Sequence, residues 1–142
     1  MVGGGLVGTE EGLTLAKTGH TVTVVEMLPR AANEVYGMYR EALMREIAKE
    51  GMTLRENTKC LEIGKDFVRV LCPDGQEETL PADTVVYALG LKPAPHQALL
   101  DAARDIPCEV IGDAVSPAKV DQATRGGYLA GIRIGAEGLE NF

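Results

Sequence analysis

The chain has 142 residues, a formal net charge of −7 and 45% hydrophobic residues, enough for one globular domain with its own core. The acidic balance argues against nucleic acid or an anionic membrane surface as the main partner. No apolar run approaches the roughly 18–20 residues of a membrane span, so we expect no membrane span, and we find no charged-then-apolar leader.

The three cysteines, Cys60, Cys72 and Cys108, are an odd number without C-x-x-C spacing. This pattern predicts neither a disulfide framework nor a zinc site. Such sparse use of cysteine fits a reducing cytosol, so we expect a cytoplasmic protein. His20 and His96 are far apart in the sequence and have no obvious metal-ligand setting, so no metal is predicted.

A glycine-rich loop opens the chain, where Gly3, Gly5 and Gly8 satisfy G-x-G-x-x-G. In this pattern the first glycine permits a tight turn, the second leaves room for a pyrophosphate, and the third lets helix and strand pack closely. Residues 6–18 should form a helix that ends at Gly19 and points its free N–H groups at the anion. We therefore predict a dinucleotide site; the alternative is a glycine-rich turn with no ligand.

The strand that should lead into this loop is truncated, because only Met1 and Val2 precede it. We interpret the chain as a piece of something larger. Residues 21–26 are rich in β-branched side chains and predict a buried parallel strand. A helix over about 38–50 and a short strand over 52–55 should follow. The residues that this helix should bury are Leu43, Met44 and Ile47.

Beyond residue 55 the spacing of the apolar residues changes from the helical period of 3.6 residues to the strand period of 2. Three short antiparallel strands are predicted over residues 59–63, 67–72 and 77–80. The further expected elements are a strand over 83–88, a helical piece near 97–104, a strand over 109–111 and a closing helix over about 119–134. This order predicts an α/β fold: a Rossmann-like parallel sheet with an antiparallel β-meander in place of one crossover helix and a truncated first strand.

An acidic residue, Glu26, ends the second expected strand and follows Gly8 by 18 residues. That is close to the spacing of about 20 residues at which an acid binds the adenosine ribose hydroxyls. A ribose 2′-phosphate carries a charge of about −1.5 to −2. At ~4 Å and an effective dielectric near 20, a carboxylate would repel it by several kcal/mol, so NADH is favoured over NADPH. Arg30 has two interpretations: it swings in to pair with a phosphate, or it is a solvated loop charge, and the second is favoured.

Glu10 also has two interpretations, of equal weight. As one of two carboxylates opening the first helix, it would be mildly stabilised by the helix dipole. Alternatively, because it lies two residues past Gly8, it would reach the nicotinamide end of the cofactor.

Several segments together resemble the pyridine nucleotide–disulfide oxidoreductase superfamily. They are the Gly3–Glu10 pattern G-G-G-x-x-G-x-E, the meander, the Tyr87–Pro93 run and the late Val110–Asp113 run. More closely, Gly4–Glu10, Val24–Leu28 and Gly112–Val115 resemble the C-terminal part of NADH:flavin oxidoreductases, a group related to Old Yellow Enzyme, 2,4-dienoyl-CoA reductase and trimethylamine dehydrogenase.

The resemblance implies a role for particular residues. The glycine loop would bind the pyrophosphate of the nicotinamide cofactor, the acid at 26 would hold its ribose, and Gly90 would line the same cofactor. Asp113, in the late Gly-Asp pair, would bind the ribityl chain of FAD. The cofactor-binding residues expected on this basis are Gly3, Gly5, Leu6, Val7, Gly8, Glu10, Glu26, Met27, Arg30, Gly90, Gly112 and Asp113.

In that superfamily the NAD(P)H domain is inserted between the two halves of the FAD domain. Gly90 and Gly112 are 22 residues apart, which leaves no room for an inserted domain. We therefore expect an NADH-binding domain over 1–105 and a C-terminal segment of the FAD domain over 106–142. Full-length relatives also carry an FMN barrel, often with an iron–sulfur cluster, and the missing FAD half and this barrel are the expected partners.

The expected function is to bind NADH and position it for hydride transfer to FAD, with no catalytic side chain and no catalysis by the isolated chain. Two alternatives stay open. One is a structural or regulatory module that binds an adenine nucleotide, and the other is a subunit completed by a separate flavin-binding chain. A second copy of the chain covering the open sheet edge is a further hypothesis.

Overall fold

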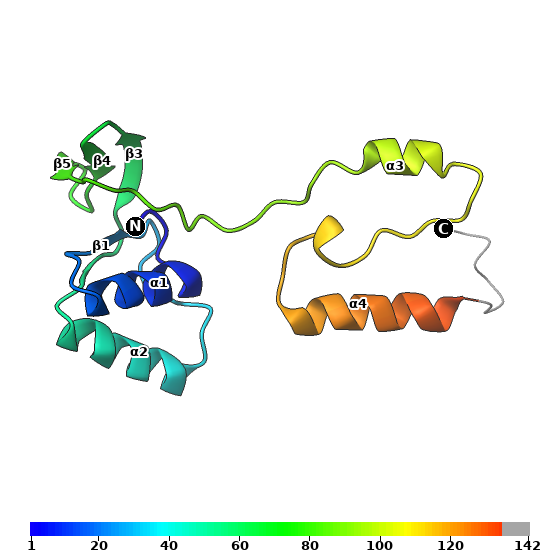
Figure 1. The fold of residues 1–142 in the computed structure, drawn as a ribbon, viewed down its shortest axis with the longest axis horizontal. Helices are drawn as coiled ribbons and strands as arrows, with labels where there is room; N and C mark the ends of the chain where they lie inside the picture. The colour runs from blue at the N-terminus through cyan, green and yellow to red at the C-terminus, as the bar shows by residue number, and fades with distance from the viewer. Residues whose placement is uncertain (135–142) are drawn as a thin grey trace. The chain divides into compact units, whose positions relative to one another are not determined.

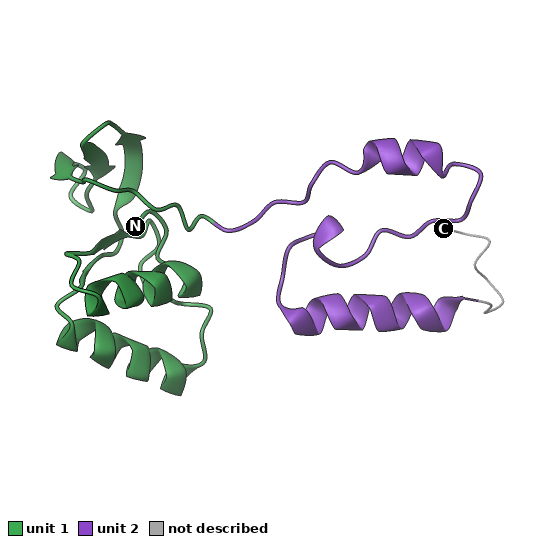
Figure 2. Cartoon of the chain, in the orientation of Figure 1, with its two compact units in different colours: residues 1–89 green, residues 90–142 purple. Residues whose placement is uncertain are grey.

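The computed structural model describes residues 1–134, and the chain divides into two compact units (Figures 1 and 2). One unit comprises residues 1–89, and the other begins at Gly90. The predicted division into an NADH part over 1–105 and an FAD part over 106–142 was drawn from cofactor roles rather than from compactness. It stays a prediction, and its last residues, 135–142, lie outside the described part of the chain.

Unit 1 contains a short parallel sheet, two helices and a β-meander. Its elements are α1 (Leu6–Lys17), β1 (Thr23–Val25), α2 (Gly37–Lys49), β2 (Thr53–Arg55), β3 (Lys59–Ile63), β4 (Phe67–Leu71) and β5 (Glu77–Pro81). Strands β1 and β2 pair in parallel, and Val2 forms parallel bridges to Val25 on one side and to Tyr87 on the other. The resulting spatial order, β2, β1, Val2, Tyr87, matches the 3-2-1-4 order of a Rossmann half.

The strand predicted over 83–88 is wrong as an extended element, because this segment forms only an isolated bridge at Tyr87. Two backbone hydrogen bonds connect this segment to Val2. The N–H of Val2 donates to the carbonyl of Val86 at 2.9 Å, and the N–H of Ala88 donates to the carbonyl of Val2 at 2.8 Å. The segment opposite, Met1–Gly3, is too short to extend this pairing into a ladder. The segment nevertheless lies beside Val2, where a Rossmann half places its fourth strand.

The predicted meander is confirmed: β3, β4 and β5 form an antiparallel sheet, with a shift of register between Cys60 and Glu62. Gly75 closes the predicted turn between β4 and β5 with a φ of +81°. A left-handed residue at this place is what a glycine adopts without steric cost.

Two apolar clusters cover opposite faces of the parallel sheet. Val24 packs among buried residues of α1 and α2, whereas its neighbour Val25 packs against Val68 and Val70 of the meander. Successive residues of a strand point to opposite faces, so β1 contributes a side chain to each cluster. The predicted burial of Leu43 and Ile47 in α2 is confirmed, with both side chains less than a tenth exposed, whereas Met44 is only partly buried against the same cluster.

Unit 2 consists of α3 (Gln97–Ala102), a 3₁₀ turn η1 (Gly112–Ala114) and α4 (Val120–Arg133). The strand predicted over 109–111 is wrong, because this extended stretch pairs with no strand within the described residues. In the described part of unit 2 no side chain is fully buried, and several large apolar side chains are exposed. Over residues 1–134, no helix has the length and apolar character needed to cross a bilayer.

Candidate functional site

The segments that follow the parallel strands meet at one edge of the sheet in unit 1. Gly3 follows Val2, Glu26 follows β1, and Glu56 follows β2. Ligands of open α/β sheets bind outside the carboxyl ends of the strands, so this edge is where a nucleotide site is expected.

Two of the glycines in the loop allow no other side chain. Gly3 has a φ of +102°, and a Cβ there would lie 2.3 Å from the carbonyl oxygen of Ala88. A Cβ at Gly8 would lie 2.0 Å from the carbonyl oxygen of Gly3. The predicted roles in the turn and in close helix packing therefore have direct steric counterparts.

The amino end of α1 holds an anionic oxygen. Gly5 is the N-cap and has no side chain to cap the helix, while Oε1 of Glu34 accepts the N–H of Leu6 at 2.5 Å. This carboxylate oxygen stands where a phosphate oxygen would lie, because unsatisfied N–H groups and the helix dipole both favour negative charge there. The loop thus fits the pyrophosphate of a dinucleotide.

Glu26 is buried beside the glycine loop. Its Oε2 accepts the N–H of Gly4 and its Oε1 accepts the N–H of Leu28, both at 2.7 Å. Because an ionised carboxylate has about four acceptor positions, each oxygen can still accept a ribose hydroxyl. The predicted acid therefore lies beside the loop with its orientation fixed by backbone donors.

Glu10 lies in the second turn of α1, since the helix begins at Leu6, so the interpretation based on the first-turn dipole is weakened. Its carboxylate instead accepts a hydrogen bond from the hydroxyl of Tyr39 on α2. This hydrogen bond and the nearby negative charge raise the pKa of Tyr39.

The remaining predicted residues of unit 1 surround this edge. Leu6 is half-buried, and the side chains of Val7, Met27 and Arg30 are exposed. The exposed side chains of Val7, Met27 and Arg30 are free of core packing and are available to a ligand.

The other predicted residues, Gly90, Gly112 and Asp113, belong to unit 2. Gly90 and Gly112 have φ values of +80° and +61°, which glycine adopts readily. Asp113 lies in η1, and its Oδ1 accepts the N–H of Ala118 at 3.3 Å, just before α4.

Sequence reasoning missed four polar residues near the edge: Glu34, Tyr39, Arg40 and Glu56. Glu34 and Glu56 lie outside the predicted helices and strands, and Tyr39 and Arg40 lie in the predicted helix over about 38–50. Glu34 reaches α1, Tyr39 reaches Glu10, and the other two side chains contact the loop after β1. These contacts depend on how the chain folds back, which spacing does not reveal.

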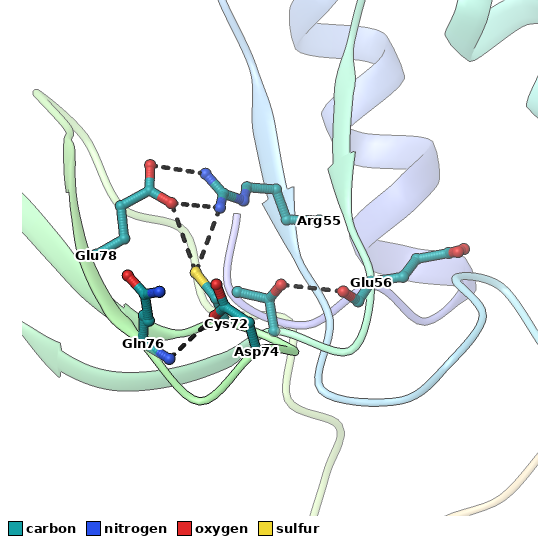
Figure 3. Close-up of polar contacts among 7 residues, drawn as sticks. Arg55, Glu56, Cys72, Asp74, Gln76 and Glu78 are labelled. Atoms are coloured by element: carbon teal, nitrogen blue, oxygen red, sulfur yellow. Dashed lines mark hydrogen bonds and ion pairs between the residues drawn. The ribbon is translucent and has the colours of Figure 1, made fainter.

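A second polar cluster joins the parallel sheet to the meander (Figure 3). Arg55, at the end of β2, forms a bidentate ion pair with Glu78 on β5 and donates to Sγ of Cys72 at 3.5 Å. The guanidinium holds the pKa of Glu78 below its usual value, and burial raises the pKa of the Cys72 thiol. Across residues 1–134 no group of three or more His, Cys, Asp or Glu side chains is placed to hold a metal ion.

The chain resembles larger oxidoreductases along nearly its whole length. It is 33% identical to an NADH oxidase of Thermoanaerobacter brockii, covering 94% of this chain and 21% of that protein. It is 35% identical to a bilirubin reductase of Mediterraneibacter gnavus (strain CC55_001C), covering 92% of this chain and 20% of that protein. The histamine dehydrogenase of Rhizobium sp. 4-9 has the same fold, with a TM-score of 0.85 at 19% identity over 99% of this chain and 22% of that one.

The α/β fold and the glycine-loop edge define a nucleotide-binding domain of the oxidoreductase type. Residues 1–124 match the pyridine nucleotide-disulphide oxidoreductase family, and the chain belongs to it. The resemblance inferred from the sequence motifs is thereby confirmed. The chain spans about a fifth of the length of the curated relatives it matches.

Proposed function

We propose that unit 1 binds NADH, with the pyrophosphate on the loop from Gly3 to Gly8 and the adenosine ribose on Glu26. One observation carries this proposal: two backbone N–H groups fix the Glu26 carboxylate beside a helix end that already holds an anionic oxygen. The two recognition elements of a dinucleotide, an anion site and a ribose acceptor, then lie on one edge of the sheet.

The position of Glu26 supports a preference for NADH over NADPH. Its carboxylate is buried and directed at the loop, so a 2′-phosphate on the same ribose would meet a negative charge. At ~4 Å and an effective dielectric near 20, the repulsion per unit charge is about 4 kcal/mol. Glu10, held by Tyr39, is proposed to lie toward the nicotinamide end.

In the whole protein we propose that NADH supplies hydride to FAD, since the relatives are oxidoreductases and the family is one of pyridine nucleotides. The role of this chain is to bind and orient the nicotinamide, which requires no acid or base from a side chain. Asp113 and the amino end of α4 are proposed to contact FAD, with residues 106–142 as part of its domain. FMN and an iron–sulfur cluster would belong to parts of the protein outside this sequence.

The proposal is tested by titrating the chain with NADH, NADPH and ADP and following NADH fluorescence and binding heat. We expect NADH to bind at least tenfold more tightly than NADPH. Glu26→Gln should narrow the ratio of the two affinities, because the amide carries no charge. It keeps one acceptor oxygen but turns its NH2 group toward one of the two backbone N–H groups, so NADH binding itself should also weaken. Glu11→Gln, an exposed change on α1, is the matched control and should leave the ratio unchanged.

ADP that binds as tightly as NADH would instead support the structural or regulatory module that recognises only an adenine nucleotide. A chain that binds none of the three nucleotides, while retaining its native circular dichroism, would contradict the proposal. If binding appears only after a separate flavin-binding chain is added, the second alternative gains support.

A further inference from the structure

The loop after β1, residues 26–32, carries Glu26 and Arg30, and we call it the ribose loop. Its backbone is hydrogen-bonded to the turn that follows β2. The N–H of Thr58 donates to the carbonyl of Glu26 at 2.8 Å, and the N–H of Asn57 donates to the carbonyl of Leu28 at 3.0 Å. The first half of the ribose loop is therefore fixed by these backbone contacts and by the Glu26 carboxylate, which accepts the N–H of Leu28.

The second half is held by two side chains at Ala31. Oε1 of Glu56 accepts the N–H of Ala31 at 2.7 Å, and Nε of Arg40 donates to its carbonyl at 2.9 Å. Glu56 and Arg40 also lie within 3.8 Å of each other as an ion pair, and both side chains are about a third exposed or less. Both polar groups of one fully buried residue are thus satisfied by a charged pair.

The next residue, Ala32, needs this support. It has a φ of +48°, a conformation unfavourable for a residue with a Cβ, and its N–H donates to the carbonyl of Gly4 at 2.7 Å. Through this bond the ribose loop returns to the glycine loop. A change at Arg40 or Glu56 would therefore be transmitted to the place where Glu26 meets Gly4.

We propose that Arg40 and Glu56 are positioning residues that set the preference between NADH and NADPH by holding the ribose loop. This inference rests on the proposed function. While the loop is held, Glu26 faces the ribose and Arg30 stays exposed in the loop. When it is released, the bond from Ala32 to Gly4 beside Glu26 is loosened, and Arg30 gains the freedom to pair with a 2′-phosphate.

Three variants of Arg40 and Glu56 distinguish their contacts with Ala31 from the ion pair between them. Glu56→Ala removes the acceptor for Ala31 and the ion pair, whereas Glu56→Gln keeps the acceptor and loses only the charge. Arg40→Lys keeps the charge and loses the planar Nε–H donor. The matched control is Glu41→Ala, because Glu41 forms a 3.9 Å ion pair with Arg45 on the same helix and both are largely exposed.

The first readout is the pair of dissociation constants for NADH and NADPH. We expect Glu56→Ala to weaken NADH binding roughly tenfold, as loss of a charged hydrogen bond predicts, and to weaken NADPH much less or strengthen it. For Glu56→Gln and Arg40→Lys we expect dissociation constants between those of Glu56→Ala and those of the unchanged chain. Glu41→Ala should have the dissociation constants of the unchanged chain. Equal losses for both nucleotides would indicate a general loss of stability and overturn the inference.

The second readout needs no nucleotide. Trypsin cuts after arginine, and the N–H of the Arg30–Ala31 peptide bond is the group that Glu56 holds. We expect Glu56→Ala to accelerate cleavage at this bond about tenfold, measured by mass spectrometry, because cleavage requires local opening. If Glu56→Ala loses its native circular dichroism, the cleavage rates of Glu56→Gln and Arg40→Lys are compared with that of the unchanged chain instead.

The two readouts distinguish the two proposals. A chain that binds no NADH, but whose Arg30–Ala31 bond opens in Glu56→Ala and not in Glu41→Ala, contradicts the proposed function and leaves the positioning role supported. An unchanged cleavage rate in every variant at the pair overturns the inference, whatever the nucleotide affinities.

Discussion

The carboxylate of Glu34 lies against the amino end of α1, with Oε1 2.5 Å from the backbone nitrogen of Leu6. A Cβ added at Gly5 would lie 3.0 Å from the same oxygen, so the carboxylate directly covers the second glycine of the loop. A pyrophosphate on this loop needs the same N–H group, and two anions cannot share it without repulsion. Nucleotide binding at this edge therefore requires Glu34 to move away.

Glu34→Gln is accordingly expected to strengthen the binding of both NADH and ADP. Because the contact is exposed and screened by solvent, the gain should be about two- to fivefold. Isothermal titration at low and at high salt measures it, and the gain should shrink as salt is added. Glu41→Gln, an equal charge change on α2, serves as the control. A weaker affinity in Glu34→Gln would mean that the carboxylate helps to hold the cofactor.

The parts of the site that the sequence predicts are those set by local constraints. Gly3 and Gly8 were predicted because a tight turn and a close helix approach exclude every side chain, and the structure places carbonyl oxygens where their Cβ atoms would lie. Glu26 was predicted because the end of a strand determines which edge of the sheet its next residue reaches.

Other features depend on partners distant in the sequence, and there the predictions fail. The apolar stretches 83–88 and 109–111 have strand composition, but ladders require a neighbour of matching length. Glu34 and Glu56 lie in irregular segments, so no period marks them. Their contacts arise only once α2 and the turn after β2 fold against the ribose loop.

Gly8→Ala should destabilise unit 1 and abolish nucleotide binding. The new Cβ would meet the carbonyl oxygen of Gly3 at 2.0 Å, and backbone cannot yield as a flexible side chain does. A loss of about 1–3 kcal/mol in the free energy of unfolding is typical of such overpacking, and urea denaturation measures it.

Gly37→Ala is the control for this change, because a Cβ at Gly37, the first residue of α2, meets no atom within 4 Å. It should be neutral or stabilising by up to about 1 kcal/mol, since alanine favours helix more than glycine does. Equal stability of Gly8→Ala and the unchanged chain would contradict the close packing of the glycine loop.

The ion pair between Arg55 and Glu78 predicts a loss of stability in acid. Hydrogen bonding to Arg55 lowers the pKa of Glu78 from its ordinary value of 4.5. A carboxyl with a lowered pKa in the folded state stabilises it fully above that ordinary value, and the contribution is lost as pH falls below it through the folded pKa.

We therefore expect Glu78→Gln to be less stable than the unchanged chain near neutral pH, and the difference to shrink as the pH is lowered below 4.5. Urea denaturation between neutral pH and pH 3 measures the free energy of unfolding of both chains as a function of pH. Glu11→Gln is the exposed control. A difference that is constant over the whole range would show that the carboxyl does not titrate in the folded state as described.

The cluster of Arg55, Cys72 and Glu78 predicts that Cys72 reacts more slowly with an alkylating agent than Cys108 does. Burial and hydrogen bonding to Glu78 raise the pKa of Cys72, although Arg55 opposes this. The thiolate is the reactive form, so iodoacetamide should alkylate the half-buried Cys72 more slowly at pH 8 than the exposed Cys108. Peptide mass spectrometry measures both rates in one sample. Glu78→Gln should accelerate the alkylation of Cys72 and leave that of Cys108 unchanged, because the Cys72 thiol donates to that carboxylate (Figure 3). Equal rates at the two cysteines would contradict a raised pKa of the Cys72 thiol, and an unchanged Cys72 rate in Glu78→Gln would contradict the contribution of Glu78 to it.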